Sequence, residues 1–313
     1  MSWLSHVGVT RDGPFVILSR GLHRVLDVDM GALALLAVFV AIDADWLKAW
    51  LLYPSSFGVD AAIYRAAADA WIHGADPWAV SRSGWYFAGP PPNLVLSLPF
   101  AFLDELTTRA LWIAGSFGAA LYSVRRLQMP LWWVLFPPLF VSAIAGNPNP
   151  LVLALLLAGR GPAAVFVKVF AAVPLVLLGR WRELVWASVA LVVTIPLLPW
   201  GYFVRDLDRV QAIIVGQGQA LSAWGTPLVI PVAVVVLMLR KRGAWLAVPA
   251  LWPYSQIHYA SLAVPGTSRW VAAALSFSTP LAPALAVAIA AFQQFRAGAI
   301  RVREQPAGTA SER

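Results

Sequence analysis

The sequence contains no cysteine and few charged residues. Without cysteine the chain cannot form a disulfide, a thiolate metal site or a cysteine nucleophile. Charged residues make up 12% of the 313 residues, hydrophobic residues make up 60%, and the mean hydropathy is +0.71. Because soluble domains carry about 25% charged residues, this shortage excludes an ordinary water-soluble globular protein. Several apolar runs approach the roughly 20 residues that a membrane-spanning helix needs, so the sequence predicts an all-α polytopic integral membrane protein.

Histidine is scarce as well, and the usual cofactor motifs are missing. The four histidines stand at positions 6, 23, 73 and 258, and no two of them have the spacing of metal ligands. The sequence has no phosphate-binding loop, no serine elbow, no zinc helix motif and no dinucleotide fingerprint. We therefore expect neither a metal nor a cofactor.

The net charge of +8 comes from basic residues that cluster in short loops. Clusters in short loops are typical of segments held on the cytoplasmic side of a membrane. They favour anionic membrane lipids as partners and give no reason to expect nucleic acid. The clusters are Arg125-Arg126, Arg180-Trp181-Arg182, Arg240-Lys241-Arg242, and Arg296, Arg301 and Arg303 in the C-terminal tail.

The apolar runs predict a single transmembrane domain over residues 1–295 with about ten spans. The first span covers roughly 30–47, after a cytoplasmic lead-in at 1–28. The run 92–103 is either a span or re-entrant, which leaves the topology of 92–160 open. The run 150–178 is either two short spans or one broken helix. Two external loops, 53–91 and 201–225, and a mobile cytoplasmic tail, 296–313, complete the predicted organisation.

The first external loop has the pattern of an amphipathic helix over residues 60–72. Asp60, Tyr64, Ala67, Ala68 and Trp71 share one face at helical spacing. Arg65 and Asp69 are spaced as an i, i+4 ion pair beside that face. Gly74 ends the helix, and Pro77 prevents it from restarting. We expect this helix to lie on the membrane surface and not to cross it.

Asp60 is the acidic residue in the best position for chemistry. At the start of a helix the dipole favours an ionised carboxylate, whereas apolar surroundings favour the protonated form. That balance suits a general base, although an N-cap carboxylate without any other role is the simpler explanation. Other acidic residues, Asp104 and Glu105 among them, are expected near cytoplasmic helix ends.

Two further polar residues stand inside later apolar runs. Lys168 interrupts an apolar helix, so it needs a partner such as a phosphate unless its side chain reaches the interface. His258 follows Pro253, Ser255 and Gln256, which indicate an irregular break. Its ring has either a ligand or an ordinary structural hydrogen bond.

The second external loop and one internal turn are less specific. Arg205 and Arg209 are spaced to clamp a phosphate if their segment is helical, but such a run is more often a solvated surface. The segment 146–150 reads Gly-Asn-Pro-Asn-Pro, which forms a turn without any further function.

The order of the motifs from about residue 60 to residue 260 resembles glycosyltransferase family 87, whose members are GT-C-type membrane enzymes. The late motifs also resemble that family, with Asn147 standing where the family has glutamine. The motifs are Asp60-x-x-x-Tyr64, His73-Gly74-Ala75-Asp76-Pro77-Trp78, Tyr86-Phe87-x-x-Pro90-Pro91, Leu98-Pro99, Gly146-Asn147-Pro148-Asn149, Lys168-Val169-x-x-x-Pro174 and Pro253-x-Ser255-Gln256-x-His258-Tyr259.

The resemblance implies a GT-C-like helical bundle that transfers mannose or a related sugar from a polyprenyl-phosphate donor. It matches Asp60 to the catalytic acidic residue, and it places Lys168 and His258 toward the lipid phosphate. We expect an inverting transfer to a lipid or glycan acceptor at the external (periplasmic) face of the cell membrane. The substrate-binding set is then Lys168, His258, Arg205, Tyr64, Trp71, Trp78 and Tyr259.

Two alternatives remain open from the sequence. A transporter or flippase of a lipid-linked sugar would use Lys168 as a charge inside the bundle, but the halves of the sequence show no inverted repeat. A non-catalytic relative would keep the fold and lose the activity.

Overall fold

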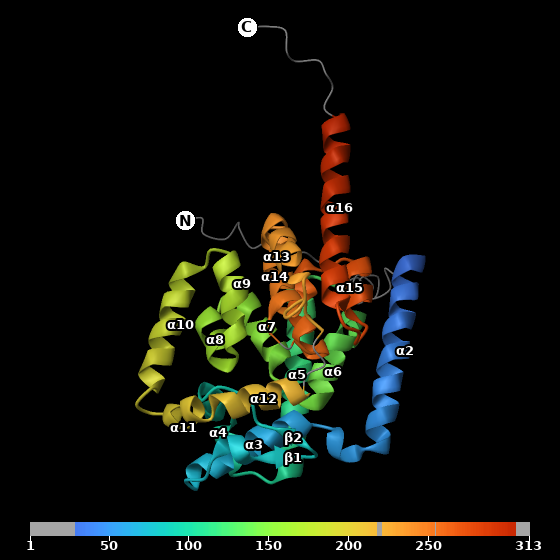
Figure 1. Cartoon of the computed structure of the whole chain (residues 1–313). Helices are drawn as coiled ribbons and strands as arrows, with labels where there is room; N and C mark the ends of the chain where they lie inside the picture. The colour runs from blue at the N-terminus through green and yellow to red at the C-terminus, as the bar shows by residue number, and fades with distance from the viewer. Residues whose placement is uncertain (1–28, 218–220, 254, 305–313) are drawn as a thin grey trace, which may run out of the picture.

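The computed structural model describes residues 29–217, 221–253 and 255–304. Within these ranges the chain is mostly helical, which confirms the predicted all-α class (Figure 1). The described strands form one short antiparallel hairpin, β1 (Ser81–Arg82) and β2 (Trp85–Tyr86). The first part of the chain forms α2 (Met30–Leu52), η1 (Pro54–Ser56), α3 (Val59–Ile72), η2 (Pro77–Ala79), this hairpin, α4 (Pro92–Ala101) and α5 (Glu105–Arg126).

The rest of the chain is divided into shorter helices. The central part forms η3 (Leu131–Leu135), α6 (Pro137–Ala145), α7 (Asn149–Leu157), α8 (Gly161–Val167), η4 (Val169–Ala171), α9 (Ala172–Leu177) and α10 (Trp181–Thr194). The last part forms α11 (Trp200–Arg205), α12 (Leu207–Gln217), α13 (Val229–Met238), α14 (Lys241–Leu251), η5 (Ile257–Gly266), α15 (Arg269–Leu275) and α16 (Ala282–Glu304).

Few of these helices have the length of a membrane span. Among the described residues, α2 alone is long and apolar enough to cross a membrane. Helices α6 and α7 reach that length only as a pair, and they meet at a bend of 118°. Proline and glycine divide the apolar runs, because each frees backbone groups and stops a helix. The ten-span bundle therefore stays a prediction.

The boundaries of the first apolar helix differ from those predicted. Helix α2 continues to Leu52, five residues beyond the predicted end at Leu47. Asp43 of this helix is buried, and no described group hydrogen-bonds to its carboxylate. At the other end of the chain, α16 runs through Glu304, so the first part of the predicted mobile tail is helical. Residues 1–28 and 305–313 lie outside the described ranges.

The predicted helix of the first external loop is confirmed as α3. It begins one residue earlier than expected, and Gly74 follows it in a left-handed conformation with φ +75°. The expected Arg65–Asp69 pair is replaced by other contacts. Arg65 donates to the carbonyl of Leu103 at 2.6 Å, while Asp69 lies 3.4 Å from His73.

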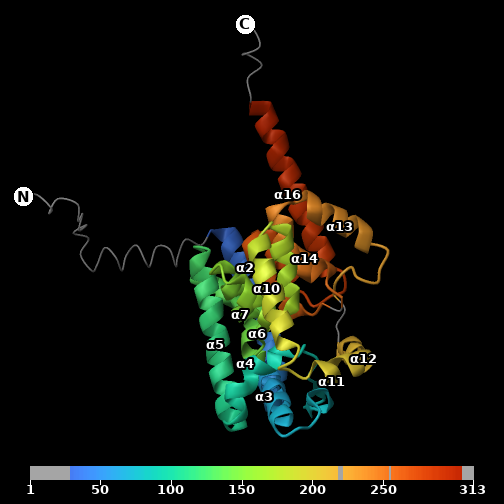
Figure 2. The same cartoon turned by 90° about the vertical axis from the view of Figure 1, so that its left-hand side faces the viewer.

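The elements gather at two ends of the molecule. Helices α3, α4, α11 and α12 and the hairpin lie together at one end, called here the α3 end (Figure 1). Helix α5 starts there, since Glu105 lies 3.7 Å from Arg82 of β1, and its 22 residues extend about 33 Å toward the opposite end (Figure 2). Asp104 and Glu105, predicted near cytoplasmic helix ends, thus lie at the end opposite Arg125 and Arg126. The reason is that α4 packs against α3 and does not carry the chain to the other end.

The opposite end, called here the basic end, carries the arginine and lysine clusters. Arg125 and Arg126 finish α5 there. The turns that join α9 to α10 and α13 to α14 also lie away from the α3 end (Figure 1), and they hold Arg180 and the Arg240–Arg242 cluster. The described basic loops therefore share one end, and α3, the hairpin, α11 and α12, which belong to the predicted external loops, share the other (Figure 1).

The perimeter of the molecule between the two ends exposes large apolar side chains. On α10 they include Val185, Trp186, Val189 and Val192, and on α13 they include Ile230, Val234 and Leu237. Monomers that live in water rarely expose contiguous apolar surface of this extent.

Candidate active site

Asp60 lies in the first turn of α3, at the α3 end of the molecule, and its side chain is half-buried. The N-cap of α3 is Gly58, without any side-chain capping bond. The simpler explanation of Asp60 as a cap is therefore wrong. Its Oδ2 instead accepts a hydrogen bond of 2.7 Å from Nδ2 of Asn147, a residue 87 positions away in the sequence.

The turn that carries Asn147 is held tightly against the start of α3. The amide of Gly58 donates to the carbonyl of Ile144 at 2.9 Å. Gly146 adopts φ +68°, and a Cβ at that position would stand 3.0 Å from the Cβ of Ala61. Oδ1 of Asn147 accepts a hydrogen bond from the amide of Asn149 at 3.0 Å, which fixes the orientation of the Asn147 amide. The segment 146–150 thus positions a site residue and is more than a turn.

Lys168 contacts α3 through Tyr64. The sequence predicted Lys168 inside a helix. The structure instead places it at the C-cap of α8, in extended backbone conformation just before η4. Its Nζ donates to the hydroxyl of Tyr64 at 2.5 Å and lies 5.3 Å from the centroid of that ring. Tyr64 is one helical turn after Asp60, so the pairing brings the ammonium to the same face of α3.

The His258 segment is joined to the site by hydrogen bonds to its backbone carbonyl. The His258 carbonyl accepts hydrogen bonds from Asn149 at 3.0 Å and from Ser261 at 2.7 Å. The His258 ring lies 5.0 Å from the Tyr259 ring. Tyr259 packs on Phe170, two residues after Lys168, at 4.7 Å. The structure therefore brings together five of the predicted residues: Asp60, Tyr64, Lys168, His258 and Tyr259.

The surroundings of Asp60 change the pKa of its carboxyl in opposite directions. Burial raises the pKa of its carboxyl above the ordinary value, whereas the Asn147 hydrogen bond and the Lys168 charge act in the lowering direction. Burial and the nearby Asp60 charge also raise the pKa of Tyr64, so its phenol stays protonated. A carboxylate with a raised pKa is a stronger base at neutral pH.

Three predicted residues lie outside this cluster or in a purely structural position. Arg205 is exposed, pairs with its neighbour Asp206 at 3.3 Å, and is not brought to Asp60. Trp78 is fully buried, and its Nε1 donates to the carbonyl of Gly89 at 3.0 Å, so its ring is part of the packing beneath α3. Trp71 is half-buried at the edge of the same apolar cluster.

Two site residues were not predicted. Asn147 was interpreted only as a turn residue, and fully buried Asn93, at the start of α4, was not considered. The Asn93 side chain lies close enough to the Tyr64 hydroxyl to lower the pKa of that phenol, against the larger raising effect of burial. An asparagine inside or beside an apolar run is the signal that could have identified both, because a buried amide needs a hydrogen-bond partner.

The site offers one half-buried carboxylate, one ammonium and several amides and phenols. In the described part of the chain, no three His, Cys, Asp or Glu side chains gather to hold a metal ion. No protein-family model, curated protein or solved structure matches this chain.

Proposed function

We propose that this protein is a membrane glycosyltransferase that moves a sugar, such as mannose, from a polyprenyl phosphate to a hydroxyl of a lipid or glycan acceptor. The observation that carries the proposal is the Asp60 arrangement: a half-buried carboxylate, oriented by Asn147, beside the ammonium of Lys168. The order of family-87-like motifs supports the same reading, since the segments around residues 60, 147, 168 and 258 meet in space.

The chemistry follows from the charges at the site. The Asp60 carboxylate removes the proton of the acceptor hydroxyl, whose oxygen forms a bond to the anomeric carbon of the sugar. The bond between that carbon and the phosphate oxygen breaks, and the polyprenyl phosphate leaves with the electron pair. Attack opposite the phosphate inverts the anomeric centre.

Lys168 stabilises the leaving phosphate. Its ammonium has three N–H donors, and one of them is used by Tyr64, so two remain for phosphate oxygens. An ammonium in a partly dehydrated site stabilises developing negative charge more strongly than it would in water. The rings of Tyr64 and Tyr259 provide apolar surface for the sugar or the prenyl chain.

The membrane setting is supported by the distribution of charge and apolar surface. Basic clusters at one end of a membrane protein favour the cytoplasmic side for that end, so Asp60 at the opposite end faces outward in this proposal. The exposed apolar side chains of α10 and α13 provide a lipid-facing perimeter between the two ends.

The test is transfer of labelled mannose from mannosyl-phosphoryl-polyprenol by the purified full-length protein in lipid, with membrane lipids and glycans as acceptors. We expect Asp60→Asn to lower the transfer rate at least about 100-fold, the usual minimum for a lost general base. The matched control is Asp69→Asn, an exposed carboxylate on the same helix, which should leave the rate unchanged. Wild-type transfer by Asp60→Asn would remove Asp60 from the mechanism, and no transfer to any acceptor by the wild type would count against the enzyme itself.

A further inference from the structure

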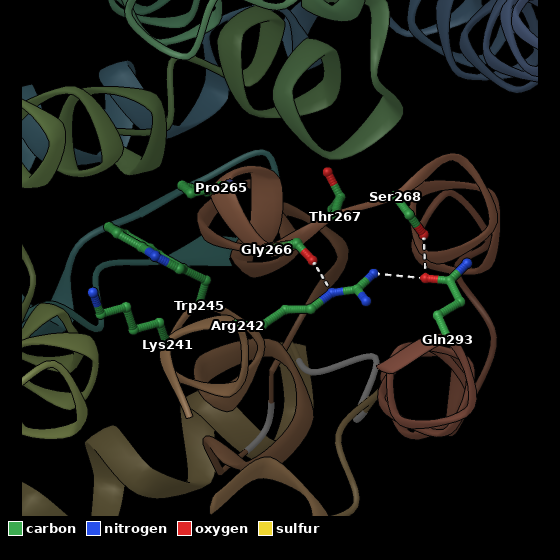
Figure 3. A pocket seen from close by; sticks show the side chains of 8 residues that line it. All are labelled: Lys241, Arg242, Trp245, Pro265, Gly266, Thr267, Ser268 and Gln293. Atoms are coloured by element: carbon green, nitrogen blue, oxygen red, sulfur yellow. Dashed lines mark hydrogen bonds between the residues drawn. The ribbon is translucent and has the colours of Figure 1, made fainter. Parts of the chain in front are cut away.

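An open pocket lies at the basic end, away from the α3 end that carries Asp60. It has a volume of about 430 Å³ and is bounded by the start of α14, the turn between η5 and α15, and α16 (Figure 3). Lys241, Arg242 and Trp245 contribute from α14, and Gln293 contributes from α16. The volume lies within the range of about 300–1,000 Å³ that small-molecule sites occupy.

Arg242 is a half-buried cation whose described partners are all neutral. Its Nε donates to the carbonyl of Gly266 at 2.8 Å, and Nη2 donates to Oε1 of Gln293 at 2.8 Å (Figure 3). Nη1 lies 3.4 Å from the carbonyl of Ala290. Within the described ranges no carboxylate pairs with this guanidinium, and burial lowers its pKa. A partly desolvated charge without a counter-charge is costly, so an external anion would be stabilising here.

The remaining N–H donors of Arg242 indicate which kind of anion would bind. A guanidinium has five N–H donors, and the three acceptors named above leave two of them for a ligand. Arginine binds phosphate oxygens through paired donors. The exposed Lys241 lines the same pocket and adds a second positive charge there, with its side chain pointing away from the Arg242 guanidinium (Figure 3). Trp245 lines the same cavity.

Two large apolar side chains that are close in sequence to lining residues are exposed. They are Trp270 on α15 and Phe292 on α16. A ligand whose head is a phosphate and whose body is hydrocarbon suits both the cations and these side chains. We propose that the Lys241–Arg242 cavity binds a phosphate ester, the group shared by anionic phospholipid headgroups and free phosphate, with the exposed apolar side chains favouring the lipid.

The experiment uses the full-length protein in detergent and native mass spectrometry of the lipid it retains. Phosphatidylglycerol is titrated against phosphatidylcholine, with and without millimolar inorganic phosphate. We expect phosphatidylglycerol to be preferred, and Lys241→Gln to weaken its binding about fivefold, as expected for one basic side chain near an anionic headgroup. Arg126→Gln removes an equally exposed charge from the same end and should have no effect.

The design separates the source of the phosphate from the existence of the site. Displacement of the lipid by inorganic phosphate would support the site and assign it to free phosphate. Equal binding of the two lipids, or equal losses in Lys241→Gln and Arg126→Gln, would overturn the proposal. Arg242→Gln should cause a larger loss, but it also breaks bonds to η5 and α16. Lys241→Gln is therefore the primary variant, because it breaks no hydrogen bond among the described residues.

Discussion

Burial and two neighbouring side chains act on the pKa of Asp60 in different directions. Burial opposes its charge, whereas the amide of Asn147 and the ammonium of Lys168 favour it. The net effect is a raised pKa, which couples the protonation of one side chain to both the stability of the fold and the proposed reaction.

The first prediction concerns stability. Because the pKa of Asp60 is raised in the folded protein above its unfolded value, its ionised form destabilises the folded state at pH values above the unfolded pKa. Asp60→Asn removes that charge, so we expect its melting temperature at neutral pH to exceed that of the wild type by a few degrees. The difference should shrink as the pH falls through the folded pKa and vanish below the unfolded one.

Thermal melts from about pH 4 to about pH 8 would measure this difference. Asp69→Asn serves as the control, since this exposed carboxylate should give no pH-dependent gain. A variant Asp60→Asn that melts below the wild type at neutral pH would contradict the assigned direction of the pKa shift. This outcome does not depend on any enzymatic activity.

The second prediction concerns Asn147. Its hydrogen bond favours the ionised Asp60, so Asn147→Ala should raise the pKa of Asp60 further and move the acid limb of the kcat/KM profile to higher pH. The loss at neutral pH should be about tenfold, as for a hydrogen bond to a charged group. Asn147→Gln keeps an amide donor and should recover part of the activity. An acid limb that stays in place while activity falls would indicate a structural role alone.

The sequence predicts individual site residues where a charged residue lies within an apolar segment. Asp60 and Lys168 were found in this way, because a charged group in apolar surroundings needs a partner. Asn147 and Asn93 carry no charge, and an amide beside proline fits an ordinary turn equally well. Their role depends on contacts between segments that are distant in the sequence. The spacing of residues within one segment does not reveal such contacts.

At the scale of elements, the site is assembled from helix ends and not from helix faces. The start of α3, the start of α7, the end of α8 and the start of η5 meet around Asp60. The close approach of Gly58 and Gly146 fixes the distance between the first two of these ends. A small displacement of the 146–149 turn would therefore separate Asn147 from Asp60.

This packing predicts a specific effect of Gly146→Ala. The residue has φ +68°, and the new Cβ would meet Ala61 at 3.0 Å. We expect a loss of roughly 1–3 kcal/mol of stability together with reduced transfer. Gly159→Ala is the matched control, since Gly159 has φ +75° but nothing within 4 Å. Gly159→Ala should lose only the stability that the unfavourable positive φ costs, and it should keep its activity. Equal losses of activity in both variants would argue against a tight fit at Gly146.

Helix α3 was predictable from sequence, because its polar and apolar residues repeat at helical spacing and glycine follows it. The apolar runs were less informative. A continuous apolar run has no periodicity with which to locate breaks. The run 150–178 is divided into α7, α8 and α9, which have nine, seven and six residues. Tertiary packing, not composition, decides where each one stops.

At the scale of the whole molecule, the two ends differ in chemistry. The described basic loops share one end, and the hairpin and α3 share the other (Figure 1). Helix α4 explains how Arg125 and Arg126 join the other basic loops, because it returns the chain to the α3 end before α5 begins. The sequence alone left that choice open.

The lack of cysteine allows this orientation to be mapped directly. Single cysteines are introduced as Ser83→Cys, in the exposed hairpin turn, and as Arg125→Cys, at the end of α5. We expect a membrane-impermeant maleimide to label the first in intact cells and the second only after permeabilisation. The cysteine-free wild type gives the background. The reverse labelling pattern would place Asp60 on the cytoplasmic side and remove the proposed external reaction.

The meeting of helix ends around Asp60 also has an electrical consequence. Both α3 and α7 begin at the site, and the first peptide groups of a helix carry about half a positive charge that no side chain supplies. Part of the field that an incoming anion experiences is therefore a property of the main chain. Substitution can remove the ammonium of Lys168, but that backbone contribution remains as long as the two short helices keep their directions.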